Sequence, residues 1–134
     1  MIYVLDTNVI SDLSRNVSIV VANHDQKLQQ GHSLVLCSPV YYESLRGLLK
    51  KNATSQIAGL NALKGALDWQ ALIEQDWLEA AQLWANADKM GKRLSDIDVL
   101  IAALVARLNA ILVSADTDFD ALPIRREDWR LAAS

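Results

Sequence analysis

The stretch Ile2-Tyr3-Val4-Leu5-Asp6 decides the fold, because it is a short apolar run that ends in a carboxylate. Its length and its β-branched residues predict a buried strand, and Asp6-Thr7-Asn8 then begins a short helix. A carboxylate at the carboxyl end of a buried strand points into the crevice where open α/β sheets bind ligands. The N-terminal stretch therefore predicts both a strand and one residue of a binding site.

Strand patterns alternate with helix patterns along the rest of the chain, which predicts an α/β fold whose parallel sheet is covered on both faces. Trp77 and Trp84 recur at helical spacing after a capping-box pattern at Asp76-x-x-Glu79, and we expect both rings in the core. Further strands are expected at residues 34–37, 70–73, 111–114 and, at an edge, 123–125. The expected helices span about residues 17–30, 39–51, 54–67, 76–91 and 97–106, the last apolar nearly all round and therefore buried.

Length and composition fit one globular domain over residues 1–134, with 51% hydrophobic and 22% charged residues. No apolar run approaches the roughly 20 residues that span a bilayer. The N-terminus has neither a basic region nor a cleavage site, so we expect no membrane segment and no signal peptide. The lone Cys37 lies among apolar residues and is expected to be buried. These features fit a cytoplasmic location.

The net charge of −3 gives no sign that the protein binds a polyanion. Three local basic pairs are the candidates for contact with such a ligand, and bound divalent cations would also change the balance. The pairs are Lys50-Lys51, Lys92-Arg93 and Arg125-Arg126.

Four acidic residues lie at the edges of apolar segments. Two carboxylates about 4 Å apart repel each other by about 4 kcal/mol at an effective dielectric constant of about 20. Several of them in one crevice are tolerable only if they are protonated or hold a cation. The pattern therefore indicates a divalent-metal site formed by Asp6, Glu43 inside the helix that begins near Pro39, Asp98 before the apolar stretch 99–106, and Asp116 after the strand 111–114.

Each of these acids also has an ordinary structural explanation. Asp6 is a good helix N-cap, with Thr7 and Asn8 as further capping groups or as donors that aim it. A glutamate such as Glu43 is usually exposed. Asp98 stands three residues after Ser95, as in a capping box.

The neighbouring acids offer alternatives. Asp96 lies about 200° round the helix from Asp98, so both cannot point at one ion, and Asp98 beside the buried stretch is preferred. The turn Asp116-Thr117-Asp118-Phe119-Asp120 approaches a calcium loop, but Ala121 stands where that loop needs glycine. The turn also resembles the D-x-D start of haloacid-dehalogenase-type phosphatases, where the motif should end the first strand and finish in Thr or Val. We discount the calcium loop, and the D-x-D of this chain departs from the phosphatase pattern because it is C-terminal and finishes in Asp120.

Taken together, the segments resemble PIN-domain ribonucleases, and most of all the VapC-like toxins of bacterial toxin–antitoxin pairs. The most specific piece is the D-x-L-I-A-A element at residues 98–103. The resemblance extends to the tail at residues 126–129 and covers essentially the whole chain. It rests on Asp6-Thr7-Asn8, the helical Glu43, residues 95–103 and residues 113–119.

This resemblance implies a single PIN-like domain over residues 1–134, with three α/β/α layers and a parallel central sheet of four to five strands. It implies that Asp6 and Asp98 hold Mg²⁺ or Mn²⁺ most directly, while Glu43 and Asp116 orient a water and complete the site. Ser114 stands where the family usually has Thr. The extra acids Asp96, Asp118 and Asp120 leave open which neighbour completes the shell of a second ion.

The same resemblance implies a metal-dependent endoribonuclease that is the toxin of a toxin–antitoxin pair. A metal-activated water would hydrolyse an RNA phosphodiester bond and leave a 5′-phosphate and a 3′-hydroxyl. Single-stranded or loop RNA is the expected substrate, because its backbone can be splayed into a narrow groove. The implied partners are a second copy of the chain and a cognate antitoxin whose tail places a basic side chain in the acidic groove.

Two other functions stay open at this point. The first is a small-molecule phosphohydrolase in which Asp116 or Asp118 is the nucleophile. The second is a non-catalytic PIN-like interaction module that keeps the fold without the chemistry. Retention of all four acids argues against the second function.

Overall fold

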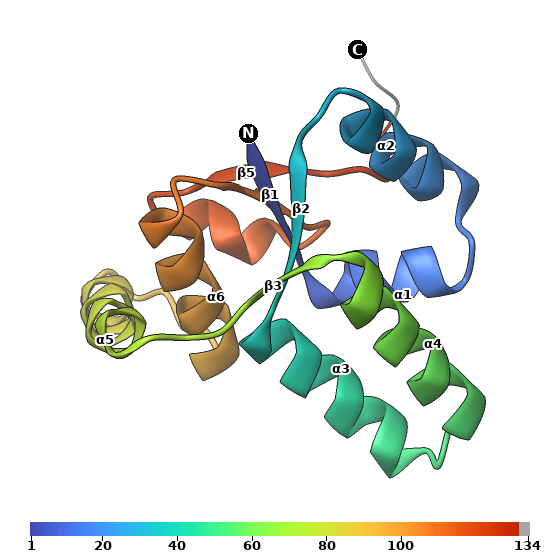
Figure 1. Ribbon diagram of the computed structural model, residues 1–134. Coiled ribbons are helices and arrows are strands. Elements are labelled where there is room, and N and C mark those ends of the chain that lie inside the picture. Colours follow the sequence, from blue (N-terminus) through green and yellow to red (C-terminus); the bar gives the residue numbers. More distant parts are fainter. Residues whose placement is uncertain (132–134) are drawn as a thin grey trace.

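A five-stranded sheet with every neighbouring pair parallel forms the centre of the molecule, in the order β3-β2-β1-β4-β5. The structure is a computed structural model that describes residues 1–131 (Figure 1). Strand β1 pairs with both β2 and β4, so it is central and its Val4 and Leu5 are fully buried. The strands are β1 (Ile2–Leu5), β2 (Ser33–Cys37), β3 (Asp68–Gln70), β4 (Ile111–Val113) and β5 (Arg125–Glu127).

Helices cover the sheet on both sides. In Figure 1, α5 and α6 stand on one side of the sheet and α1, α2 and α4 on the other. This arrangement confirms the predicted three-layer α/β/α fold with a parallel sheet. The helices are α1 (Thr7–Ser14), α2 (Ser18–Gln29), α3 (Ser38–Lys50), α4 (Thr54–Ala66), α5 (Glu74–Lys89) and α6 (Asp96–Arg107), with a short 3₁₀ helix η1 (Thr117–Ala121). Within residues 1–131, no helix is long and apolar enough to cross a membrane.

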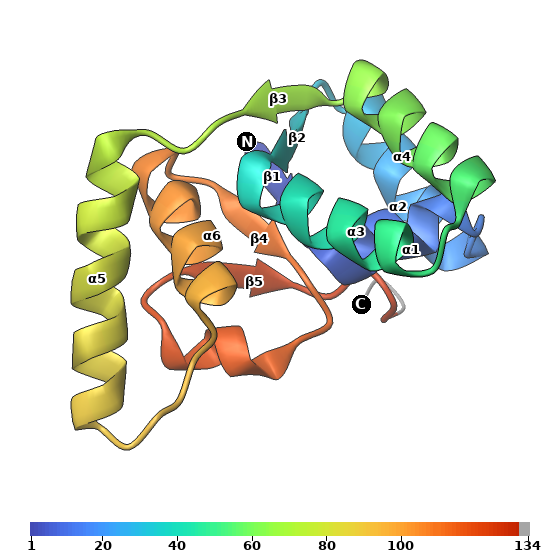
Figure 2. The same ribbon diagram turned by 90° about the horizontal axis from the view of Figure 1, so that it is seen from below.

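Helix α6 is the central helix of the core, as its sequence predicts. Residues 101–105 are all buried, and α6 lies between α5 and α3 in Figure 2. Burial on nearly every side explains why the helix is apolar nearly all round. Ser95 caps it by accepting a hydrogen bond from the backbone N–H of Asp98 at 3.1 Å. Cys37 is also buried, as expected.

Two strands lie at positions different from those predicted. Strand β3 ends at Gln70, and the chain then leaves the sheet, where the Leu72 backbone N–H donates to the Ser38 hydroxyl at 3.0 Å. The strand predicted at 70–73 is therefore wrong, because it lies about one strand length too far along the sequence. The apolar Leu72 and Ile73 instead form the entry to α5. Strand β5 lies at Arg125–Glu127 and pairs with β4, slightly beyond the predicted 123–125.

The prediction for the start of α5 is wrong in two respects. Its N-cap is Ile73, and the Asp76 carboxylate accepts from the Ile73 backbone N–H at 3.0 Å, so Asp76 lies inside the first turn. Trp77 and Trp84 are 55% and 45% exposed, not in the core. The buried stripe lies next to them on the helix, so the periodicity was correct but the face was wrong. That stripe consists of Asp76, Ala80, Leu83 and Ala87.

A buried ion pair joins α5 to α6. The Arg107 guanidinium donates through Nε to Asp76 Oδ1 at 2.8 Å and through Nη2 to Oδ2 at 3.1 Å. Asp76 is only 1% exposed. Burying a carboxylate is tolerable here because a bidentate arginine and a backbone N–H satisfy its oxygens.

Replacing Arg107 by Met should destabilise the protein by about 3–5 kcal/mol, because it leaves the Asp76 carboxylate buried without its cation. Urea unfolding followed by circular dichroism measures this change. Arg15→Met is the matched control, since Asp12 would keep its second partner Arg130, and it should cost no more than about 1 kcal/mol. Equal losses in the two variants would contradict the prediction.

Candidate active site

The acidic residues lie where the order of the sheet reverses. The chain passes from β1 to β2 and β3 on one side, and it returns to β4 and β5 on the other side of β1. In open parallel sheets, the crevice at the carboxyl ends of the two strands at such a switch point is the ligand-binding position. Asp6 follows β1, and Ser114 and Asp116 follow β4, so they meet at that edge.

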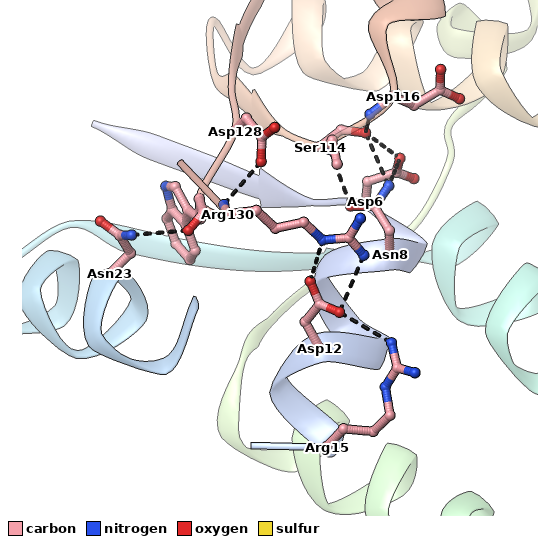
Figure 3. Close-up of polar contacts among 11 residues, drawn as sticks. Asp6, Asn8, Asp12, Arg15, Asn23, Ser114, Asp116, Asp128 and Arg130 are labelled. Carbon is pink, nitrogen blue, oxygen red and sulfur yellow. Dashed lines mark hydrogen bonds and ion pairs between the residues drawn. The ribbon is translucent and has the colours of Figure 1, made fainter. Parts of the chain in front are cut away.

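Asp6 is buried and held by three hydrogen-bond donors, of which Ser114 and Asn8 are labelled in Figure 3. Its Oδ1 accepts from the Thr7 backbone N–H at 2.8 Å. Its Oδ2 accepts from the Ser114 hydroxyl at 2.7 Å and from Asn8 Nδ2 at 3.1 Å. Each carboxylate oxygen has two acceptor positions, so Oδ2 is filled while Oδ1 keeps one for another ligand.

Asn8 and Ser114 fix the loop after β4 against the start of α1. Asn8 Oδ1 accepts from the Ala115 backbone N–H at 3.2 Å. The Ser114 hydroxyl accepts from Asn8 Nδ2 at 3.2 Å and from the Asp116 backbone N–H at 3.0 Å. These contacts require a hydroxyl at position 114, which Ser114 supplies.

Glu43 reaches the site from α3 through Thr7. The Thr7 hydroxyl donates to Glu43 Oε1. Arg46, one turn further along α3, has its Nη2 3.7 Å from Glu43 Oε2. The Glu43 carboxylate is therefore tied to the residue that follows Asp6.

Asp98 lies in the first turn of α6 and is half-buried. Burial raises its pKa to about 6, a hydrogen bond with Ser95 lowers it in part, and the negative charges of Asp6, Asp116 and Glu43 raise it further. The pKa of Asp6 is also raised, first by burial, although the Ser114 and Thr7 hydrogen bonds oppose this; the charges of Glu43 and Asp116 add to the rise. Asp98 thus lies within electrostatic reach of the other three predicted acids, and Asp6 within reach of Glu43 and Asp116.

Asp96 and Asp118 differ from this group because both are exposed. The backbone N–H of Asp118 donates to Asp116 Oδ1 at 2.9 Å, which caps η1. This contact orients Asp116, while the Asp118 carboxylate lies at the surface. The Asp120 carboxylate is paired with Arg126 at 2.8 Å.

The donor set at the site fits a hard divalent cation. It consists of carboxylate oxygens with hydroxyl and amide groups around them, and Mg²⁺ takes oxygen ligands while it keeps several waters. Within residues 1–131, no group of three or more acidic, histidine or cysteine side chains lies close enough together to hold a metal ion as its ligand shell. An ion that is held by one or two carboxylates and completed by water does not require such a shell.

The sequence did not predict a set of ion pairs around Asp12, on the helix that begins at the site. Arg130 donates through Nε to Asp12 Oδ2 at 2.7 Å and through Nη2 to Oδ1 at 3.2 Å, while Arg15 donates to the same Oδ1 at 3.2 Å (Figure 3). The guanidinium of Arg130 holds the pKa of Asp12 below its usual value. Because α1 carries both Asp6 at its N-cap and Asp12, the C-terminal segment helps to fix the site. The two partners are 118 residues apart, so no local pattern could reveal them.

Comparison with known proteins places this geometry in a family. The PIN domain matches residues 3–124. Ribonuclease VapC1 of Haemophilus influenzae strain R2866 is 29% identical over 133 residues, which cover 96% of this chain and 98% of the relative.

Solved structures agree with that match. VapBC-1 from nontypeable Haemophilus influenzae is 26% identical, with a TM-score of 0.84 over 98% of this chain and 100% of that chain. VapBC2 from Rickettsia felis, bound to a DNA fragment from its promoter, is 23% identical and shares the fold, with a TM-score of 0.85 over 96% of this chain and 99% of that chain. Because the family match runs from β1 to the residue before β5, the chain belongs to the PIN domain family.

Proposed function

We propose that this protein is a metal-dependent endoribonuclease, the toxin of a toxin–antitoxin pair, that cleaves RNA in the cytoplasm. The observation that carries this proposal is the convergence of four carboxylates at the switch point of a parallel sheet. The name ribonuclease borne by the Haemophilus relative supports the reaction class. The VapBC structure from the same species supports the toxin–antitoxin role. The four carboxylates are Asp6, Glu43, Asp98 and Asp116.

The metal in this proposal is Mg²⁺ or Mn²⁺, held most directly by Asp6 and Asp98. When bound, such an ion lowers the pKa of a coordinated water and neutralises charge on a phosphodiester. Asp6 is well suited to hold it, because its three hydrogen bonds fix the carboxylate and leave one acceptor position on Oδ1. Glu43 and Asp116 would orient a water and accept its proton.

A second copy of the chain is also part of the proposal. Helix α5 presents large apolar side chains to solvent, which is unusual for a helix on the surface of a monomer. Burying this face between two copies would remove it from water. The antitoxin remains the partner of the acidic groove, where a basic side chain would replace the cation. The exposed side chains on α5 are Trp77, Leu78 and Trp84.

Asp6→Asn and Asp98→Asn should each lower RNA cleavage in Mg²⁺ or Mn²⁺ by about a hundredfold or more, because each removes a charge that would hold the metal. Cleavage of a labelled single-stranded RNA on a denaturing gel measures this loss. Asp25→Asn is the control, since Asp25 is exposed on α2 and belongs to neither the acidic site nor the α5–α6 loop. Activity equal to wild type in both site variants would overturn the proposal. A phosphoenzyme without RNA cleavage would favour a phosphohydrolase instead.

Asp98→Asn should also change how stability depends on pH when a chelator removes metal. The carboxyl has a pKa of about 6 in the folded protein against 3.8 as its ordinary value, so the folded state holds its proton more tightly. Wild-type stability therefore falls as the pH rises from about 4 to about 6, and the Asn variant lacks this loss. Thermal melts across this range measure the difference between the two proteins.

The same melts with millimolar Mg²⁺ or Mn²⁺ provide the metal arm of that experiment. Near pH 8, metal should raise the Tm of the wild type more than that of Asp98→Asn, because the ion binds only the folded state. Identical metal responses would contradict a metal role for Asp98. A variant that loses stability in parallel with wild type as the pH rises would contradict the pKa assignment.

Trp84→Glu should weaken self-association by about tenfold or more, because it places a charge in the apolar face of α5. Sedimentation velocity at several protein concentrations measures the dimer fraction. Asn86→Glu is the matched control, since position 86 lies about 200° round the helix from position 84. A wild-type protein that stays monomeric at all concentrations would rule out the dimer.

A further inference from the structure

A cleft of about 380 Å³ lies beside the acidic site, between the loop that joins α5 to α6 and the 3₁₀ helix η1. Both walls lead directly into the site, because Leu94 precedes the cap of α6 and Thr117 follows Asp116. Figure 2 shows the α5–α6 loop at the lower edge of the molecule, with the orange-red helix η1 to its right, below β5. The cleft is lined by Lys92, Arg93 and Leu94 on one wall and by Thr117, Asp118, Asp120 and Ala121 on the other. We call it the Lys92–Arg93 cleft.

The charges in this cleft favour an anion. Asp120 is already neutralised, because Arg126 donates to its two oxygens at 2.8 Å and 2.9 Å. Neither Lys92 nor Arg93 takes part in an ion pair in the part of the chain that the structure describes. Two unpaired cations therefore face the single remaining carboxylate of Asp118.

The backbone holds both walls of the cleft in place. Helix α5 ends at Lys89, and Gly91 follows its C-cap Met90 with a φ of 77° that suits glycine. The Lys92 backbone N–H then donates back to the Ala87 carbonyl at 2.9 Å. On the facing wall, the Asp118 N–H bonds to Asp116 Oδ1 at 2.9 Å and Phe119 is buried. A ligand that enters the cleft does not have to order the backbone on either side, which lowers the entropic cost of binding.

The acidic site creates a need for such cations. Four carboxylates repel an RNA backbone, and the protein carries a net charge of −3. Metal ions offset this repulsion at the scissile phosphate, but the flanking phosphates lie beyond that point. Arginine binds phosphate through a planar fork and lysine binds it as a point charge. The Lys92–Arg93 cleft supplies one of each next to the site.

We propose that the Lys92–Arg93 cleft is a subsite for the backbone of single-stranded RNA and binds one or two phosphates that flank the scissile bond. This inference rests on the proposed ribonuclease function. The Thr117 hydroxyl and the Asp118 carboxylate on the facing wall are suitable partners for a ribose 2′-hydroxyl. Asp118 would thus accept a hydrogen bond from the ribose, although its negative charge repels the phosphates.

The test compares wild type with the double variant Lys92→Gln/Arg93→Gln. Fluorescence anisotropy in a chelator gives the Kd for a labelled single-stranded RNA of about a dozen nucleotides at several KCl concentrations. The variant should raise Kd by about tenfold or more, because two charged hydrogen-bonding groups are lost. The slope of log Kd against log salt should fall by about 1.4, which corresponds to two phosphates of a single strand. Cleavage in Mg²⁺ or Mn²⁺ should show the same loss in KM.

The control is Lys27→Gln/Lys64→Gln, which removes the same number of positive charges on α2 and on α4, outside the three basic pairs. It should bind and cleave RNA as wild type does. Equal Kd values and salt slopes for wild type and Lys92→Gln/Arg93→Gln would overturn the inference, even where wild type cleaves RNA. Absence of cleavage by wild type would overturn the proposed function, and the binding measurement would still decide whether the cleft binds RNA. Thermal melts establish that both double variants are folded.

Discussion

The structure depends on placing like charges at the carboxyl end of a buried parallel sheet. Asp6 ends the central strand and is 5% exposed, so its charge is costly unless donors surround it. Ser114, Asn8 and the Thr7 backbone supply those donors. The remaining acids are close enough to raise the pKa of Asp6 and Asp98. A fold that served stability alone would remove this repulsion, whereas a divalent cation would convert it into binding energy. The site is therefore strained electrostatically and well ordered geometrically.

Much of this arrangement was predictable from local sequence. An apolar run that ends in Asp6 predicts a strand and its terminal acid, and the apolar helix at residues 97–106 predicts its own burial. The errors arose where tertiary contacts decide the outcome. Trp77 and Trp84 have the same periodicity as the buried stripe of α5, and only the packing against α6 selects which stripe is buried. The bond between Arg130 and Asp12 links positions 118 residues apart, which no pattern in a single sequence reveals.

Membership of the PIN domain family and the geometry of the acidic site are independent observations, and both support a ribonuclease. The family match concerns the chain as a whole, while the hydrogen bonds of Asp6 concern single atoms. The distribution of charge over the surface is a third feature of the site. Arg126 neutralises Asp120 and also donates to the Ser114 carbonyl at 2.9 Å, so one arginine secures both the end of β4 and the turn beside it. The cations at residues 92 and 93 remain available to a ligand. The surface next to the acidic site is therefore asymmetric in charge, because its unpaired positive groups lie on one wall only.

The bond from Ser114 to Asp6 spans 108 residues and has a consequence for biosynthesis. A ribosome releases Asp6 before the hydroxyl that orients this carboxylate, because Ser114 is made 108 residues later. Strand β5 and Arg130 follow later still. A nascent chain therefore holds an incomplete acidic centre, and a damaging nuclease would remain inert beside the messenger that encodes it until Ser114 and the segments after it have emerged.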